Sequence, residues 1–202
     1  MPRDSEFAST LANYVGQSSY AAGLDAVGLV PTAQLATGAT TTAVFLRGDR
    51  TWASAGIAQV VVGASTTVVT GTTVLPYDNT PPQITEGDQY LAVSYASKAI
   101  GNTVVVEAEI NGSRNAGIGV AALYDAASTS AVTATRADGN VAGGVSFLLR
   151  LMYNTVTATT ATQTYVVRAG PSSAGTFTLN GEGGAGLFGN AVRSTIVLTE
   201  FA

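Results

Sequence analysis

The sequence predicts an all-β protein whose main part is an antiparallel β-sandwich. From residue 57 onward, short runs rich in Val, Ile and Thr are separated by clusters of Gly, Asn, Asp and Pro, as in strands joined by turns. Several runs alternate apolar and polar residues with a period of two, which gives a strand one buried and one wet face. No helical pattern separates the runs, so a sandwich is favoured over a sheet with helical crossovers.

Composition divides the chain into three parts. Residues 1–22 show a short helical spacing of apolar side chains that Gly16 would end. Residues 23–56 are rich in Gly, Ala and Thr and hold scattered apolar side chains without a sustained period. Such a segment buries little surface by itself, so we expect an extended, mostly irregular stem that packs on other chains. Residues 57–202 are expected to form the globular domain.

The alternation is clearest over residues 102–110, where four apolar positions alternate with positions that include two glutamates. The other expected strands are 58–62, 66–70, 89–95, 117–124, 132–136, 145–153, 162–168, 176–180 and 194–200. Residues 145–153 are apolar on both faces, which predicts a central strand that also meets a neighbouring subunit. In the last strand, Ile196 and Leu198 share one face, and Val197 lies on the other.

The residue types present exclude several classes of chemistry. The 202 residues include no cysteine and no histidine, which removes disulfides, thiolate zinc sites and every Ser/His or Cys/His mechanism. We expect no enzyme activity, no bound metal and no cofactor. The net charge is −4 and the 9 basic residues are scattered singly, so no nucleic-acid partner is expected. No run approaches the ~20 apolar residues of a membrane span, and the charged start has no signal-peptide character.

Charge is unusually sparse. Asp, Glu, Lys and Arg make up 11% of the chain, against a usual share of roughly 25%. A chain with so little charge is expected to cover much of its surface with other subunits.

Two sets of residues resemble proteins of tailed bacteriophages. Residues 28–35 (GLVPTAQL) and 45–52 (FLRGDRTW) resemble a stem segment common in phage fibre proteins, although Arg50 stands where Gly or Asn is usual. The second set resembles the small trimeric heads that end many phage fibres, which are jelly rolls similar to tumour-necrosis-factor-type domains. It consists of residues 75–83, 86–88, 168–175, 188–189 and 194–200.

The resemblance covers roughly residues 24–202 and implies a homotrimeric virion fibre made in the host cytoplasm. Residues 1–22 would attach to other virion proteins, residues 23–56 would form an intertwined stem, and residues 57–202 would form a jelly-roll head. The resemblance further implies a tail fibre or tip that attaches to the host surface, with a surface glycan as the candidate ligand. A head fibre or capsid decoration protein is the alternative, because both share the head fold and only the attachment segment decides between them.

In heads of this kind the last strand lies near the three-fold axis. The resemblance, with the position of bulky side chains, therefore implies a trimer interface that includes Phe45, Trp52, Phe147, Ile196, Leu198 and Phe201. Receptor contacts are expected where aromatic and short polar side chains follow the strands, because such side chains bind glycans on rigid loops. These candidates are Arg114, Asn115, Tyr124, Asp125, Asp138 and Asn140.

Three short motifs have a structural interpretation that we prefer to the functional one. Arg47-Gly48-Asp49 spells an adhesion tripeptide but lies between expected packing residues, so we expect a tight turn. Gly181–Gly186 matches G-x-G-x-x-G without the βαβ unit that dinucleotide binding needs. Asn111-Gly112-Ser113 is a glycosylation sequon by its letters and is expected to be a hairpin turn.

The carboxylates also have two interpretations. Asp78, Glu86 and Asp88 could bind Ca²⁺ but lack the spacing of a dedicated calcium loop, so we expect Asp78 to cap a turn. Glu107 and Glu109 could form a hydrolytic pair but are expected to lie on a solvated strand face.

Overall fold

The computed structural model describes residues 44–46, 52–54, 56–137 and 145–202, and the chain divides into two units, Met1–Ala55 and Gly56–Ala202. In the first unit, β1 (Val44–Leu46) pairs antiparallel with β2 (Trp52–Ser54), and Leu46 lies opposite Trp52. The expected helical spacing in residues 1–22, most of the expected stem and the Arg47-Gly48-Asp49 motif lie outside the described residues. The expectations for these parts stay predictions.

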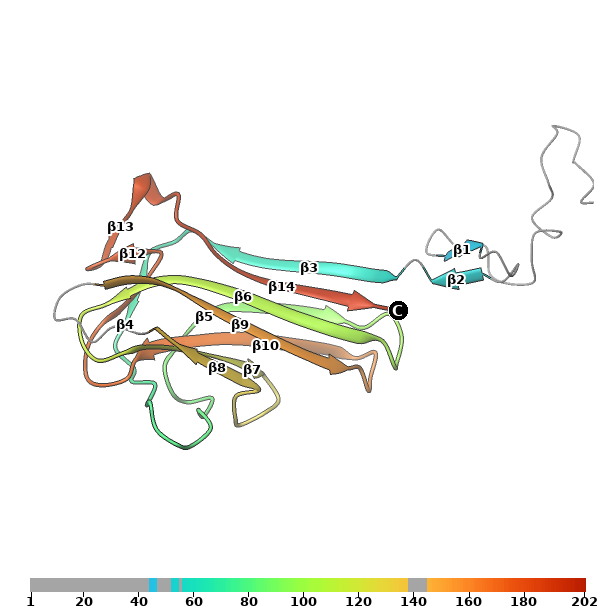
Figure 1. Ribbon diagram of the computed structural model, residues 1–202, viewed down its shortest axis with the longest axis horizontal. Helices are drawn as coiled ribbons and strands as arrows, with labels where there is room; N and C mark the ends of the chain where they lie inside the picture. Colours follow the sequence, from blue (N-terminus) through green and yellow to red (C-terminus); the bar gives the residue numbers. More distant parts are fainter. Residues whose placement is uncertain (1–43, 47–51, 55, 138–144) are drawn as a thin grey trace, which may run out of the picture. The chain divides into compact units, whose positions relative to one another are not determined.

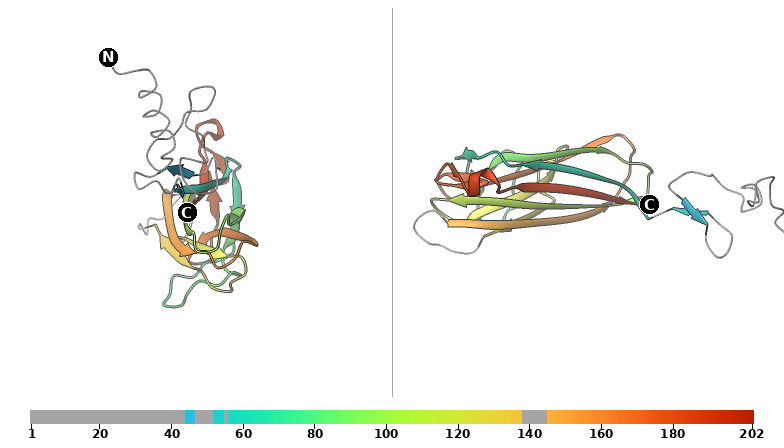
Figure 2. Two further views of the ribbon diagram at one scale, coloured as in Figure 1. Left: turned by 90° about the vertical axis from the view of Figure 1, so that its right-hand side faces the viewer. Right: turned by 90° about the horizontal axis from the view of Figure 1, so that it is seen from above.

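The second unit is an antiparallel β-sandwich (Figures 1 and 2). The first sheet contains, in spatial order, β3 (Ile57–Ser65), β14 (Ser194–Phe201), β6 (Thr103–Arg114) and β9 (Val145–Val156). The second sheet contains β5 (Asp88–Ala96), β10 (Thr162–Pro171), β7 (Gly119–Asp125) and β8 (Thr133–Arg136). Counted along the chain, the strands run first, eighth, third, sixth in one sheet and second, seventh, fourth, fifth in the other. This is the order of a jelly roll, so the predicted fold class is confirmed.

Shorter elements complete the unit. The first sheet is extended at one end by β11 (Phe177–Leu179), which pairs with β6, and by β4 (Val69–Gly71). The G-x-G-x-x-G segment forms a small hairpin of β12 (Gly181–Glu182) and β13 (Ala185–Gly186), which leads to a short 3₁₀ helix, η1 (Phe188–Asn190). At the other end of the sandwich, the Ala202 N–H donates to the Gly56 carbonyl at 2.8 Å, so the start and the end of the unit lie together.

The main core lies between the two sheets, as the alternation of the strands requires. The first sheet buries one face of β6 and β14, including Val104, Val106 and Ile196. The second sheet buries Leu91, Val93 and the inward residues of β7 and β10 against them. Aromatic pairs join the core, with Tyr95 stacked on Tyr165 at 6.1 Å and Phe177 beside Tyr90 at 5.3 Å between ring centroids.

Two expectations about strands are wrong. Asn111-Gly112-Ser113 is not a turn, because β6 continues through it and pairs there with β9 on one side and with β11 on the other. A Cβ on Gly112 would lie 2.6 Å from the Phe177 ring, so close packing accounts for the glycine. Residues 145–153 do not form a central strand, because among the described strands β9 pairs only with β6 and lies at the edge of the sheet.

Candidate functional site: the two outer faces of the sandwich

Residues 72–87 cross the outer face of the second sheet, and we call them the covering segment. Leu75 in this segment is completely buried in a second hydrophobic cluster, which contains Val120, Ala122, Tyr124 and Val166. Backbone hydrogen bonds hold the segment in place, from Leu75 N–H to the Pro171 carbonyl and from Gly87 N–H to the Val74 carbonyl, both at 3.0 Å. The covering segment is therefore fixed on the sheet by its own small core, as is usual for hydrophobic clusters beneath long loops.

Tyr124 fixes the middle of the covering segment from below. Its ring is fully buried, and its hydroxyl donates to the Gln83 carbonyl at 2.9 Å. Burial, with the nearby Glu86 carboxylate, raises the pKa of Tyr124 to about 12, so the hydroxyl keeps its proton and remains a donor.

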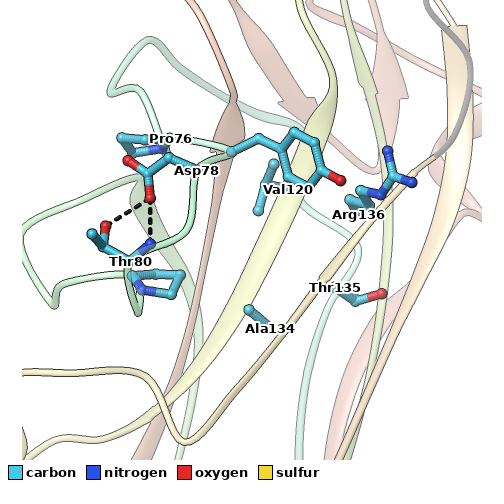
Figure 3. Close-up of a pocket in the computed structure, with 9 residues that line it drawn as sticks. Pro76, Asp78, Thr80, Val120, Ala134, Thr135 and Arg136 are labelled. Atoms are coloured by element: carbon cyan, nitrogen blue, oxygen red, sulfur yellow. Dashed lines mark hydrogen bonds between the residues drawn. The ribbon is translucent and has the colours of Figure 1, made fainter.

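Beside Leu75, the covering segment and β8 enclose a hollow of about 460 Å³, which we call the Tyr77 hollow (Figure 3). In Figure 3, Asp78 and Arg136 lie on either side of Val120, with Ala134 and Thr135 below them. The apolar lining comes from Pro76, Pro82, Val120 and Ala134, and the polar lining from Tyr77, Asp78, Thr80, Thr135 and Arg136. An apolar floor with a few polar groups at its rim is typical of small-molecule sites.

The polar groups of the Tyr77 hollow are held in defined positions. The Thr80 backbone N–H and hydroxyl both donate to Asp78 Oδ1, at 2.8 and 2.6 Å, and these bonds lower the pKa of the Asp78 carboxyl. The Arg136 guanidinium carbon lies 4.7 Å from the centroid of the Tyr77 ring, a cation–π contact. Tyr77 nevertheless remains 54% exposed. The hollow thus presents a carboxylate, a guanidinium and an aromatic ring to solvent.

The three carboxylates considered as a calcium site accept hydrogen bonds at three different places in the chain. Asp78 accepts from Thr80, as expected for a turn cap, whereas Glu86 accepts from Gln83 N–H at 2.8 Å. Asp88 accepts from the Thr73 hydroxyl and N–H at 2.7 and 3.0 Å. Among the described residues, no three acidic side chains are grouped closely enough to hold a metal ion. None of the helical segments in the same residues is long and apolar enough to cross a membrane.

Two of the candidate receptor contacts are wrong as exposed loop residues. Arg114 is 2% exposed at the end of β6, and Tyr124 is buried in β7 beneath the covering segment. Asn115 is exposed and accepts from Thr176 N–H at 2.7 Å, and Asp125 ends β7 and accepts from Ala127 N–H at 3.0 Å. Asp138 and Asn140 lie outside the described residues.

Our sequence-based candidates missed Tyr77, Thr135 and Arg136. The available signal was an aromatic residue between Pro76 and Asp78, in a segment rich in Pro and Asp that an exposed loop would provide. Its partners on β8 lie far along the chain and become neighbours only through the strand order.

The outer face of the first sheet is not covered by the described part of the chain, and it exposes several large apolar side chains among polar ones. One row across the sheet pairs Val62 with Val197, Val197 with Glu107, and Glu107 with Met152. Met152 is 68% exposed and Val62 54%. Val60, Leu148 and Val156 add to the same face from the two edge strands.

The same face carries few charges. Arg150 and Glu109 face each other across β9 and β6 and form an exposed ion pair at 2.8 Å, and Glu107 lies in the next row. These residues border a shallow hollow of about 470 Å³ together with Met152, Thr195 and Val197. Glu107 and Glu109 thus lie on the outer face of β6, where the guanidinium of Arg150 pairs with Glu109.

The predicted interface residues of the head do not all lie on this face. Ile196 and Leu198 point into the main core and are fully buried, because the inward positions of β14 are the even ones. Phe147 also packs inward, since its ring lies 5.8 Å from that of Phe177 and close to Gly119 of the second sheet. Assigning Ile196 and Leu198 to an interface was wrong, whereas Phe147 is half-buried against the core and its interface role stays a prediction. Phe201 remains 39% exposed, and the side chains of Phe45 and Trp52 lie outside the description.

Comparisons with known proteins bear only on the fold. No family model matches the chain, and no curated protein sequence matches it. Among solved structures, the chain is similar to one described as "Structure of Eiger TNF from S. frugiperda", with 12% sequence identity and a TM-score of 0.41. The similarity covers 73% of this chain and 94% of that chain. The jelly-roll assignment does not depend on it, since the strand order alone carries it.

Proposed function

We propose that three copies of this chain form the head of a tailed-bacteriophage fibre and that this head attaches the virion to the host surface. The observation that carries the proposal is the apolar outer face of the first sheet, which exposes Val60, Val62, Leu148, Met152 and Val156. Large exposed apolar patches on a soluble domain mark interaction surfaces.

Further copies of the same chain are the partner that this face fits. Its exposed apolar residues lie on both edge strands, so a neighbour that packs its β3 edge against β9 covers residues on both chains at once. Such a head-to-tail contact repeats without end unless the rotation closes, and three copies close it. Closure also protects the two edges, which would otherwise invite uncontrolled strand pairing.

The phage assignment rests on the sequence. The stem-like motifs at residues 28–35 and 45–52 and the head-like segments support a virion fibre. The proposed subunit contact uses the first sheet, so the second sheet of the head remains available to bind a ligand on the host surface. A head fibre or capsid decoration protein would use the same trimer at another place on the particle.

Light scattering tests the trimer. The intact chain should have the mass of about three chains, and Val62→Lys with Met152→Lys should reduce it to one, because the substitutions place charges in the contact. Tyr77→Lys is the matched control, since Tyr77 is exposed to the same 54% as Val62 but lies at the second sheet. A stable monomer of the intact chain, or a trimer that tolerates both lysines, would refute this arrangement.

The place on the virion needs a separate measurement. Images of particles labelled at the C-terminus of this chain should show the label on the tail. Label on the capsid would favour the head-fibre alternative, and particles without label would contradict a virion role.

A further inference from the structure

We propose that the Tyr77 hollow is a binding site for a neutral saccharide. The apolar face of one pyranose ring would lie against Tyr77 and the floor of the hollow, and adjacent hydroxyls would bond to Asp78 and Arg136. The inference deepens the proposed function, because it names the ligand class by which the head would hold a host surface.

The lining of the Tyr77 hollow matches the two-sided chemistry of a sugar. A pyranose has a face of C–H groups and a rim of hydroxyls that both donate and accept hydrogen bonds. Here Val120, Ala134 and the two prolines provide the apolar surface, while a carboxylate and a guanidinium stand at the sides. The volume of about 460 Å³ lies within the roughly 300–1,000 Å³ of small-molecule sites.

The two charged groups have complementary hydrogen-bonding roles. Both bonds from Thr80 go to Asp78 Oδ1, so Oδ2 can accept from a ligand hydroxyl. Arg136 offers only donors, in a fixed planar arrangement, and its contact with the Tyr77 ring orients the guanidinium. Neighbouring hydroxyls of one sugar can then donate to the carboxylate and accept from the guanidinium.

The site is formed before any ligand arrives. Leu75 is fully buried directly beside the hollow, the Asp78–Thr80 turn is closed by two hydrogen bonds, and Tyr124 holds Gln83 from below. Little conformational entropy is then lost on binding, which matters for a weak ligand bound at three equivalent sites.

Charge and location favour a neutral polymer that is presented on a surface. The chain carries a net charge of −4 and the hollow balances one anion against one cation, so an anionic glycan gains no long-range attraction. The hollow lies on the outer side of the second sheet, opposite the apolar face proposed to contact other subunits, so covering that face does not by itself fill the hollow.

Methyl NMR on the full-length chain tests the proposal, with the Val120 and Ala134 methyl groups as reporters of the hollow. The probes are the methyl pyranosides of glucose, galactose, mannose and N-acetylglucosamine, titrated singly, with methyl glucuronide as the anionic comparison. We expect at least one neutral glycoside to shift both reporters in a saturable way while the Val60 and Val62 signals stay unchanged.

Variants then assign the binding to its groups. Tyr77→Ala and Arg136→Ala should each weaken binding about tenfold or more, and Ala134→Leu should block it by filling the floor. Phe188→Ala is the matched control, because Phe188 is another exposed aromatic, at 86%, outside the hollow. Unchanged core methyl signals establish that each variant is folded.

The proposal is overturned if no neutral glycoside shifts the two reporters, if only the glucuronide does, or if binding survives both Tyr77→Ala and Arg136→Ala. Each of these results can occur in a chain that is trimeric by light scattering, so the ligand assignment can fail while the proposed assembly stands. A monomeric chain that binds a neutral glycoside would support the ligand site and refute the proposed trimer.

Discussion

The outer face of the second sheet is covered by the chain itself, whereas the outer face of the first sheet is left uncovered by the described residues. Over the second sheet, Leu75 and its neighbours form a small core of their own. Beyond this cover the exposed side chains of β5 and β10 are small or polar, and Ser94 and Thr164 are joined by an exposed hydrogen bond of 2.7 Å. The first sheet instead exposes Val62 and Met152.

This difference separates a sheet face that its own chain covers from one that the described residues leave exposed. An exposed strand face that needs no partner carries polar or small residues rather than large apolar ones, as the uncovered part of the second sheet does. Valine and methionine in the same situation on the first sheet are the exposed apolar residues on which the proposed subunit contact rests. The second sheet is covered within one chain, which leaves it available for the proposed ligand site, while the first sheet carries the face that the proposed trimer would bury.

Removing the anchor of the cover should have the largest effect on stability. Leu75→Ala deletes a fully buried side chain beneath the covering segment, and such a change typically lowers the free energy of unfolding by ~2–5 kcal/mol. Denaturant unfolding at fixed protein concentration measures this loss. Tyr77→Ala, two residues away and half exposed, should change the same quantity by less than about 0.5 kcal/mol. Equal effects of the two substitutions would mean that the cover has no core of its own.

A smaller loss of stability is expected when Glu200, near the end of β14 in the first sheet, is substituted. Glu200 is fully buried there and accepts hydrogen bonds from Ser97, Asn102, Gln59 and the Lys98 N–H. Burial alone would raise the pKa of its carboxyl, but these bonds together hold it below the ordinary 4.5.

The stabilisation from Glu200 is therefore present above pH 4.5 and is lost as the pH falls through the lower pKa of the folded state. Glu200→Gln leaves buried donors without an ionised acceptor and should cost about 1–3 kcal/mol near neutral pH. Unfolding curves recorded from neutral to acidic pH should show that the variant loses less stability on acidification than the intact chain. Parallel curves would contradict this role of Glu200.

The sequence predicted the positions of the strands better than the surfaces that the two faces of each strand contact. Alternation in residues 102–110 and 194–200 located β6 and β14, because one face of each is in the core. The same alternation does not tell which of the two faces of β14 packs in the core and which faces outward. The interface expected at Ile196 and Leu198 is therefore wrong, because the main core buries both side chains. Local turn chemistry also failed at Gly112, where pairing with two strands outweighs the Asn-Gly preference.

The Tyr77 hollow was beyond sequence reasoning for a similar reason. Tyr77 is in a recognisable Pro- and Asp-rich segment, but Arg136 reaches it from β8 only because the fold places that strand beneath the covering segment. Single candidates at strand ends, such as Arg114 and Tyr124, took part in packing instead.

Thiol accessibility tests the contrast between the two faces most directly, because the chain contains no cysteine of its own. Val62→Cys places one thiol on the outer face of the first sheet, and Ser94→Cys places one on the uncovered, exposed part of the second sheet. In the native assembly, we expect the Val62→Cys thiol to react with a soluble thiol reagent at least about tenfold more slowly than the Ser94→Cys thiol. After unfolding, both thiols should react at the same rate. Equal rates in the native protein would show that the outer face of the first sheet is open to solvent and would contradict its burial by other subunits.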